Sequence, residues 1–235
     1  MYNLTPINFK EFRGQKDLIK SLIILLQESK KIPNMIFVAP KGYGKYSLAN
    51  IISQFKDRSL QPITSNNIVD EFELLNILAN LKNNAILFIE DINKLKPELK
   101  KLLFDIYNSI NLDKVEKICY SNKRFKIKNF SIIGTINSSN QIDSSKWEGF
   151  KIFNLKKYSL NNLNQIINYN RLKTNFKLGN SLVEYILNNC NNNPGILNEV
   201  YLKAIDYFAI KNKEMNLKQL KKLLNKTNKK YEKIN

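Results

Sequence analysis

Ten residues near the N-terminus, Val38 to Ser47, have the composition of a loop that binds phosphate; they read VAPKGYGKYS. Gly42 and Gly44 allow the backbone to curve its N–H groups around an anion, and Lys45 supplies a cation for the terminal phosphates. Such a loop lies between a buried strand and the first turn of a helix. It therefore constrains the fold to an α/β arrangement with a parallel sheet.

Two positions in this loop depart from the usual pattern. Ala39 stands where the first glycine is expected, and Tyr46 stands where a Ser or Thr would hold Mg²⁺. Ser47 is the nearest hydroxyl, but one step along a helix turns a side chain by about 100° away from the metal. We expect a retained phosphate cradle, a weakened metal site, and a Tyr46 side chain that packs or lies over the pocket.

Composition limits the class of protein. The chain has 235 residues, of which 43% are hydrophobic, which is enough for one domain and a smaller companion. No run approaches eighteen apolar residues and the N-terminus lacks a signal-peptide pattern, so we expect a cytoplasmic protein without a membrane span.

Cys119 and Cys190 lie far apart and form no CxxC pair, which indicates reduced thiols without structural zinc. The absence of histidine excludes imidazole chemistry.

The net charge of +18, from 38 basic and 20 acidic residues, favours a polyanionic partner such as DNA or RNA. The alternative is that lysines are spread over every surface, as in any chain rich in Lys, Asn and Ile. The strongest local excess of lysine is in residues 211–235. Both interpretations stay open at this point.

Apolar periodicity predicts strands and helices in alternation along the first part of the chain. Strands are expected at 34–38, 85–89 and 130–134, helices at 15–29, 45–55, 69–81 and 97–110, and a hairpin at 114–128. After Lys157 the pattern is helical only, from Leu160 to Leu224. We predict an αβα sandwich with a parallel sheet in residues 1–157 and an all-helical lid in residues 158–235.

The order of several segments resembles the RuvB family, the AAA+ motors of Holliday-junction branch migration. Phe9–Gln15 is similar to the family's F-x-x-[FY]-x-G-Q, and Ile86–Leu95 to L-F-I-D-E-I-H-R-L. Ile63–Ser65 is similar to the family's I-T-S-G strand and Phe130–Thr135 to F-T-L-I-G-A, while Tyr158–Leu160 resembles the start of the lid. The resemblance covers nearly the whole chain.

The resemblance implies ATP or ADP with Mg²⁺ as cofactors, Holliday-junction DNA as substrate, a RuvA-like junction-binding partner, and a ring oligomer. The expected nucleotide contacts are Phe12, Gly42, Tyr43, Gly44, Lys45, Tyr46, Ser47, Tyr158 and Pro194. The family also has a winged-helix domain, which we expect to be absent because the chain ends at Asn235. The lysines from Lys218 to Lys233 either replace its grip on DNA or form the solvated face of the last helix.

The acidic pair that follows the second strand is reversed relative to the family. Asp then Glu would support Mg²⁺ and polarise the attacking water, but this chain has Glu90 then Asp91, with Ser47 as the remaining metal candidate. A misplacement on the order of 1 Å can reduce a rate roughly 100-fold. Asn137 is either the polar sensor between the acids or an ordinary turn residue.

Two arginines of the family also lack counterparts. Lys146 is the only basic residue where the trans-acting arginine finger is expected, and Gly195 occupies the position of the lid arginine. Lysine cannot reproduce the planar bidentate fork of arginine. The resemblance therefore implies either a motor with weakened hydrolysis or a non-catalytic AAA+ subunit. A stand-alone basic nucleic-acid binder is a third class, and it leaves the phosphate loop unexplained.

The predicted hairpin corresponds to the family's contact with RuvA. Basic and aromatic residues are mixed on its return strand: Lys123, Arg124, Phe125 and Lys126. They are candidates for a partner or DNA contact. The alternative interpretation is an ordinary exposed hairpin that covers the edge of the sheet.

Overall fold

The computed structural model describes residues 2–111, 117–120, 122–138 and 147–233. These residues form two compact units, which we treat separately. The sheet unit comprises Ser21–Val38 and Ala49–Asn154, and the loop–lid unit comprises Met1–Lys20, Ala39–Leu48 and Leu155–Asn235. This division differs from a single boundary at Tyr158, because the first twenty residues and the phosphate loop group with the helices.

The sheet unit contains a five-stranded, wholly parallel sheet in the order β2-β3-β6-β1-β7. Its strands are β1 (Met35–Val38), β2 (Leu60–Thr64), β3 (Ala85–Glu90), β6 (Phe130–Ile136) and β7 (Lys151–Asn154). The three central strands are almost continuously buried, as expected where both faces are covered. The predicted parallel α/β sheet is confirmed, and β7 is an edge strand that the sequence did not predict.

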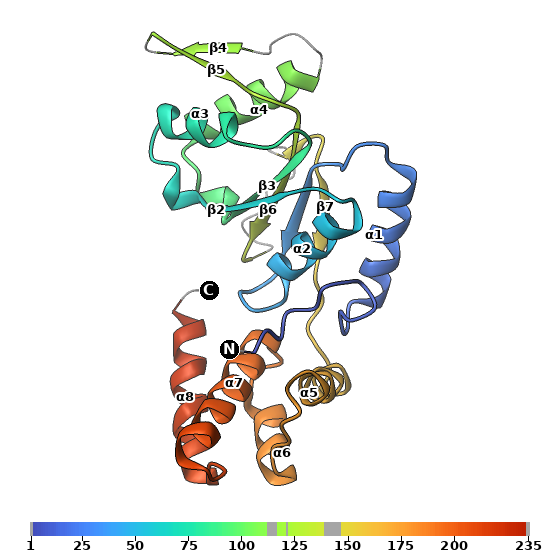
Figure 1. Cartoon of the computed structure of the whole chain (residues 1–235), viewed down its shortest axis with the longest axis vertical. Helices are drawn as coiled ribbons and strands as arrows, with labels where there is room; N and C mark the ends of the chain where they lie inside the picture. The colour runs from blue at the N-terminus through green and yellow to red at the C-terminus, as the bar shows by residue number, and fades with distance from the viewer. Residues whose placement is uncertain (1, 112–116, 121, 139–146, 234–235) are drawn as a thin grey trace. The chain divides into compact units, whose positions relative to one another are not determined.

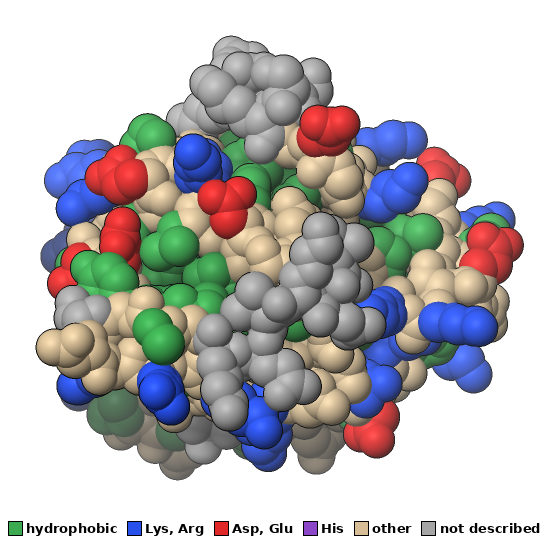
Figure 2. Space-filling model, turned by 90° about the horizontal axis from the view of Figure 1, so that it is seen from above, with side chains coloured by type: hydrophobic (Ala, Val, Ile, Leu, Met, Phe, Trp, Pro, Cys, Tyr) green, Lys and Arg blue, Asp and Glu red, His purple; other side chains and the backbone are tan. Residues whose placement is uncertain are grey.

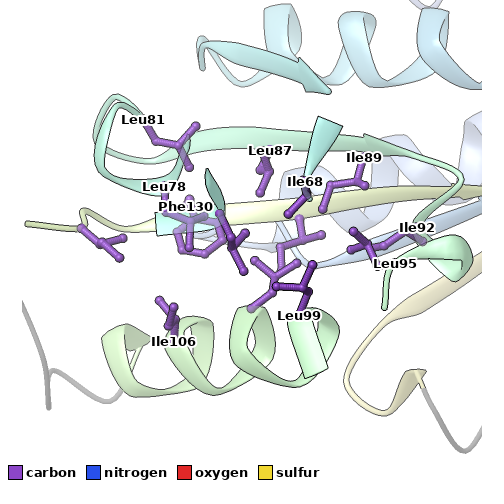
Figure 3. Close-up of a cluster of buried hydrophobic side chains, with 14 of the residues drawn as sticks. Ile68, Leu78, Leu81, Leu87, Ile89, Ile92, Leu95, Leu99, Ile106 and Phe130 are labelled. Carbon is purple, nitrogen blue, oxygen red and sulfur yellow. The ribbon is translucent and has the colours of Figure 1, made fainter. Parts of the chain in front are cut away.

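Helices α3 (Glu71–Ala79) and α4 (Pro97–Asn111) supply apolar side chains to the core of the sheet unit. Leu99 and Ile106 of α4 point toward side chains of β3 and β6, among them Leu87 and Phe130 (Figure 3). Pro97 opens α4, where a missing N–H has no consequence. Asp70 caps α3 by accepting a 2.8 Å hydrogen bond from the N–H of Glu73.

The predicted hairpin is present as β4 (Lys117–Tyr120) and β5 (Lys123–Lys126), which pair antiparallel. It lies beside α3 in Figure 1. Phe125 is only 6% exposed and packs edge-on against Phe72, with ring centroids 5.8 Å apart. The ammonium of Lys123 lies 4.6 Å from the centroid of the same Phe72 ring. The hairpin is therefore anchored to α3 by an aromatic pair.

Within the loop–lid unit, four helices follow residue 158 in the part of the chain that the structure describes: α5 (Leu160–Thr174), α6 (Asn180–Asn189), α7 (Pro194–Lys211) and α8 (Leu217–Glu232). Side-chain caps fix where they begin. Ser159 and Asn216 form capping boxes, and Asn193 caps α7 ahead of Pro194. The helical lid expected from periodicity is confirmed.

Two further helices, α1 (Lys16–Glu28) and α2 (Lys45–Phe55), cross the division between the units along the chain. No helix among the described residues is long and apolar enough to cross a membrane. Figure 2 shows Lys and Arg side chains distributed around one face and interspersed with Asp and Glu. On that face the positive charge is spread rather than gathered in one area.

Candidate nucleotide-binding site

The phosphate loop has the backbone that its glycines predict. Gly42 and Gly44 adopt φ angles of +93° and +91°, a left-handed region that L side chains rarely adopt. Each also allows a close approach: a Cβ on Gly44 would lie 2.9 Å from the ring of Phe12. Helix α2 starts at Lys45, so its free N–H groups and its positive dipole end belong to the loop.

Lys45 is turned back onto its own loop. Its side chain is only 8% exposed, and its ammonium donates to the carbonyl of Ala39 and, at 3.2 Å, to that of Pro40. The buried charge is thus solvated by backbone carbonyls of the loop. A bound phosphate would have to compete with these carbonyls for the ammonium.

Aromatic residues from three parts of the chain pack together at the loop, and one of them, Tyr43, belongs to it. Phe12, Tyr43 and Tyr158 are each at most 7% exposed. The Tyr158 hydroxyl donates to the Tyr43 carbonyl at 3.3 Å, and the two rings meet edge-on with centroids 5.7 Å apart. Burial raises the pKa of Tyr158 well above its usual range, so this hydroxyl remains a neutral donor. The structure therefore brings together four of the predicted nucleotide residues, the fourth being Gly44.

The N-terminus of α7 closes onto the same loop. The Asn193 amide donates to the Lys41 carbonyl at 2.8 Å, and the Gly195 N–H donates to the Gly42 carbonyl at 2.9 Å. A Cβ on Gly195 would lie 2.6 Å from the Cα of Gly42. Pro194, a predicted nucleotide residue, is therefore next to the loop, while position 195 has no room for the side chain of an arginine.

Tyr46 and Ser47 occupy the second and third positions of α2. Tyr46 is 48% exposed, so its ring is not part of the core, and a position over the pocket stays a prediction. Ser47 is partly buried one residue further along the helix. Neither arrangement supplies the hydroxyl that usually follows the lysine.

In the sheet unit, Asn137 is hydrogen-bonded to Asp91. Asn137 directly follows β6 and donates from its amide to one carboxylate oxygen of Asp91 at 2.7 Å. The other oxygen forms a 2.7 Å ion pair with Lys94. Asp91 has φ 55°, a left-handed conformation that is uncommon outside glycine and frequent at functional sites. Glu90 is the last residue of β3 and is partly buried.

Two of the usual Mg²⁺ ligands are altered in this chain, one in each unit. Mg²⁺ takes about six oxygen ligands, several of them from water and phosphate, with one or two free carboxylates from the protein. Here both oxygens of Asp91 already have partners, and position 46 has no hydroxyl ligand. Among the described residues, no group of three or more acidic, Cys or His side chains could hold a metal ion.

The hairpin residues proposed as a partner or DNA contact differ in exposure. Lys123, Arg124 and Lys126 are exposed on the hairpin, whereas Phe125 is buried and anchors it, so Phe125 does not offer a contact surface. Lys146 lies outside the described residues.

Two residues beside the loop were not predicted, Asn193 and Tyr231. Asn193 precedes a proline, which is a helix-start signal, and Tyr231 continues the apolar stripe of α8 through Leu220, Leu224 and Thr227. These two signals predict a helix start and a buried helix face. Neither predicts that Asn193 or Tyr231 contacts the phosphate loop.

The comparisons with known proteins agree on one family. Residues 4–154 match the family model described as "Holliday junction DNA helicase RuvB P-loop domain". The chain is 28% identical over 232 residues to the "Holliday junction branch migration complex subunit RuvB" of Mesomycoplasma hyopneumoniae, which covers 95% of this chain and 72% of that protein. It is 28% identical over 214 residues to the subunit of the same name from Mycoplasmopsis synoviae, covering 88% of this chain and 68% of that protein.

Solved structures support the same fold. The Thermotoga maritima RuvB Holliday junction branch migration motor superposes with a TM-score of 0.76 at 21% identity, covering 94% of this chain and 72% of that one. Domain III of the replication initiation protein DnaA from Thermotoga maritima matches with a TM-score of 0.70 at 16% identity. At these identities the likeness concerns the fold alone. The family model matches residues 4–154, well over half of this chain, and the chain therefore belongs to the RuvB family.

Proposed function

We propose that this chain is a RuvB-like AAA+ subunit that acts on Holliday-junction DNA in recombination and repair, binds ATP or ADP, and hydrolyses ATP weakly. The observation that carries the proposal is the phosphate loop itself. Gly42, Gly44 and Lys45 keep its geometry, while Gly195 and Tyr46 leave it without two groups that turnover requires.

Nucleotide binding follows from groups on the loop. The start of α2 presents backbone N–H groups and the positive end of the helix dipole, which favour a phosphate there. Lys45 would exchange the carbonyls of Ala39 and Pro40 for phosphate oxygens. Phe12 and Tyr158 pack beside the loop as buried aromatic side chains, so a base that stacks there would displace part of this packing.

Weak hydrolysis follows from charges that are missing or already paired. A positioned arginine contributes roughly 10³–10⁵ to turnover in related chemistry. At position 195 the contact with Gly42 excludes one, and the Asp91 carboxylate is held by Lys94 and Asn137. Mg²⁺, where it accompanies the nucleotide, would be held mainly by phosphate and water.

The test is calorimetry with ATPγS followed by steady-state ATPase assays with and without junction DNA. We expect measurable binding, loss of binding in Lys45→Ala, and turnover far below that of an intact motor. Turnover in the usual motor range with stimulation by junction DNA would show that the hydrolytic site is intact. No binding at millimolar nucleotide would exclude the proposed cofactor.

A non-catalytic AAA+ subunit is the second candidate, and the pairing of Asp91 with Lys94 favours it. It binds nucleotide, DNA or ring partners without turnover. The ATPase assay separates the two candidates, because residual turnover that Lys45→Ala abolishes occurs only in the first. In either case we propose a cytoplasmic protein that works in an AAA+ ring with a RuvA-like junction-binding protein, since the relatives are named as subunits of a branch migration complex.

A further inference from the structure

Tyr231, in the last turn of α8, lies against the phosphate loop. A Cβ on Gly42 would be 2.8 Å from Cε1 of the Tyr231 ring, and a Cβ on Gly195 would be 2.9 Å from the Tyr231 hydroxyl oxygen. The ring therefore covers the place where the loop and the start of α7 meet. Two glycines allow this contact, because any side chain at either position would occupy the space of the ring.

The loop is also closed through its backbone. The Gly42 carbonyl accepts from Gly195, the Lys41 carbonyl accepts from Asn193, and the carbonyls of Ala39 and Pro40 accept from Lys45. The carbonyl groups of Ala39, Pro40, Lys41 and Gly42 are thus satisfied inside the protein. A nucleotide phosphate accepts hydrogen bonds, so it must draw the Lys45 ammonium away from the carbonyls of Ala39 and Pro40. The stability of the closed loop therefore lowers the apparent affinity for nucleotide.

The last turns of α8 are held in place by the neighbouring helices. Lys230 forms a 2.9 Å ion pair with Glu199 of α7, and the Asn228 amide donates to the Asn189 carbonyl of α6 at 3.0 Å. Thr227 is buried. These contacts fix the position from which the Tyr231 ring reaches Gly42, so the contact with the loop is a built feature of the unit.

We propose that Tyr231 is a positioning residue that holds the phosphate loop closed against the N-terminus of α7, and that nucleotide binds tightly only when its ring moves away from Gly42. This inference rests on the proposed binding of nucleotide by the loop. The packing of the Tyr231 ring stabilises the closed loop, and its hydroxyl contributes little. Removing the ring weakens the closed state and raises the affinity for nucleotide.

The first test is calorimetry with ATPγS on Tyr231→Ala, Tyr231→Phe and Lys229→Ala. Lys229→Ala is the matched control, because Lys229 is exposed in the same turn of α8. We expect Tyr231→Ala to bind about three- to tenfold more tightly, the scale of one lost aromatic contact. Tyr231→Phe and Lys229→Ala should match the unmodified chain. Unchanged or weaker binding by a folded Tyr231→Ala protein overturns the proposal.

Amide hydrogen exchange separates this inference from the proposed function and does not depend on nucleotide. In the absence of ligand, residues 39–48 should exchange faster in Tyr231→Ala than in Tyr231→Phe. If no variant binds ATPγS but residues 39–48 still exchange faster in Tyr231→Ala, the proposed nucleotide binding is wrong and the closure of the loop by Tyr231 is supported. Equal exchange in the two variants overturns the closure. Should Tyr231→Ala fail to fold, the unmodified protein decides: at an ATPγS concentration that calorimetry shows to be bound, exchange in the last turn of α8 must become faster, and no change there overturns the proposal.

Discussion

Gly42 and Gly195 lie far apart in the sequence, yet their backbones meet at the phosphate loop. From the sequence, Gly195 is the position of a missing arginine, which suggests restoring that arginine. The structure shows that even one carbon at this position would lie 2.6 Å from the Gly42 Cα. The missing charge and the close approach are therefore one feature, because the glycine that removes the arginine also permits the contact.

At the residue scale we predict that Gly195→Arg lowers stability and leaves turnover low. The side chain must push α7 from the loop, and overpacking of this kind typically costs about 1–3 kcal/mol. Thermal unfolding measures the loss. Ile210→Arg is the control, since Ile210 is 77% exposed on the same helix and should tolerate the change. Equal melting temperatures for the two variants would contradict the prediction.

Restoring the hydroxyl at position 46 alone should raise ATPase activity only slightly. Tyr46→Thr returns a metal ligand to α2, but Gly195 still supplies no charge and Asp91 remains paired. Groups that stabilise a phosphoryl-transfer transition state act as one constellation, so single repairs are strongly non-additive. We expect an increase of less than about tenfold in steady-state ATPase activity. A rise of several hundredfold would mean that Tyr46 is the principal defect.

Glu11 gives a pH-dependent contact within the loop–lid unit. The hydrogen bond from Tyr169 holds the pKa of Glu11 below its usual value of 4.5, and the Ile7 N–H and the Lys173 ammonium, 3.5 Å away, act in the same direction. A depressed carboxyl pKa stabilises the fold above the unfolded pKa and loses that contribution as pH falls through the folded pKa. The difference in melting temperature between the unmodified chain and Glu11→Gln should therefore be largest near pH 7 and shrink below about pH 4.5. A constant difference down to pH 3 would contradict this sign.

At the scale of elements, what the sequence could predict depends on length and burial. The strands β1, β3 and β6 are apolar runs buried on both faces, and all three were predicted. β7 was missed because its four residues, KIFN, lie at the sheet edge, with polar ends and a half-exposed pattern. Periodicity identifies elements that bury a continuous face, and it is weak for short edge strands. For the same reason periodicity predicted helices up to Leu224 but not the contact between Tyr231 and the phosphate loop.

One hairpin residue, Phe125, anchors the hairpin to α3, and its neighbours Arg124 and Lys126 are exposed. Phe125→Ala should destabilise the sheet unit by about 3 kcal/mol, because a buried aromatic ring that packs on Phe72 is lost. Arg124→Ala with Lys126→Ala should leave the melting temperature unchanged, since both side chains are exposed. We expect this double variant to bind a RuvA-like partner or junction DNA more weakly, measured by titration at fixed salt. Unchanged binding to both would leave the hairpin with a structural role only.

At the scale of the whole molecule, the net charge of +18 raises the question of whether any one surface holds DNA. Figure 2 shows basic side chains spread around one face with acids between them. On α8 the lysines are exposed and the opposite face is buried through Leu220, Leu224 and Thr227. Burial of the apolar stripe accounts for this helix without a ligand, so we expect α8 to act as a solvated face.

Salt dependence of DNA binding distinguishes spread charge from a local grip. We compare two triple Lys→Gln variants, one on α8 and one on exposed lysines near the start of the chain: Lys218, Lys222 and Lys226 against Lys16, Lys20 and Lys30. Each lysine that truly neutralises a phosphate contributes about 0.9 to the slope of log affinity against log salt, so three lost contacts would lower the slope by about 3. With spread charge, both variants should lose a similar small amount of affinity and slope. A selective loss of about 3 in the α8 variant would instead assign the DNA grip to that helix, and its last turn would then join a nucleic-acid surface to the Tyr231 contact on the phosphate loop.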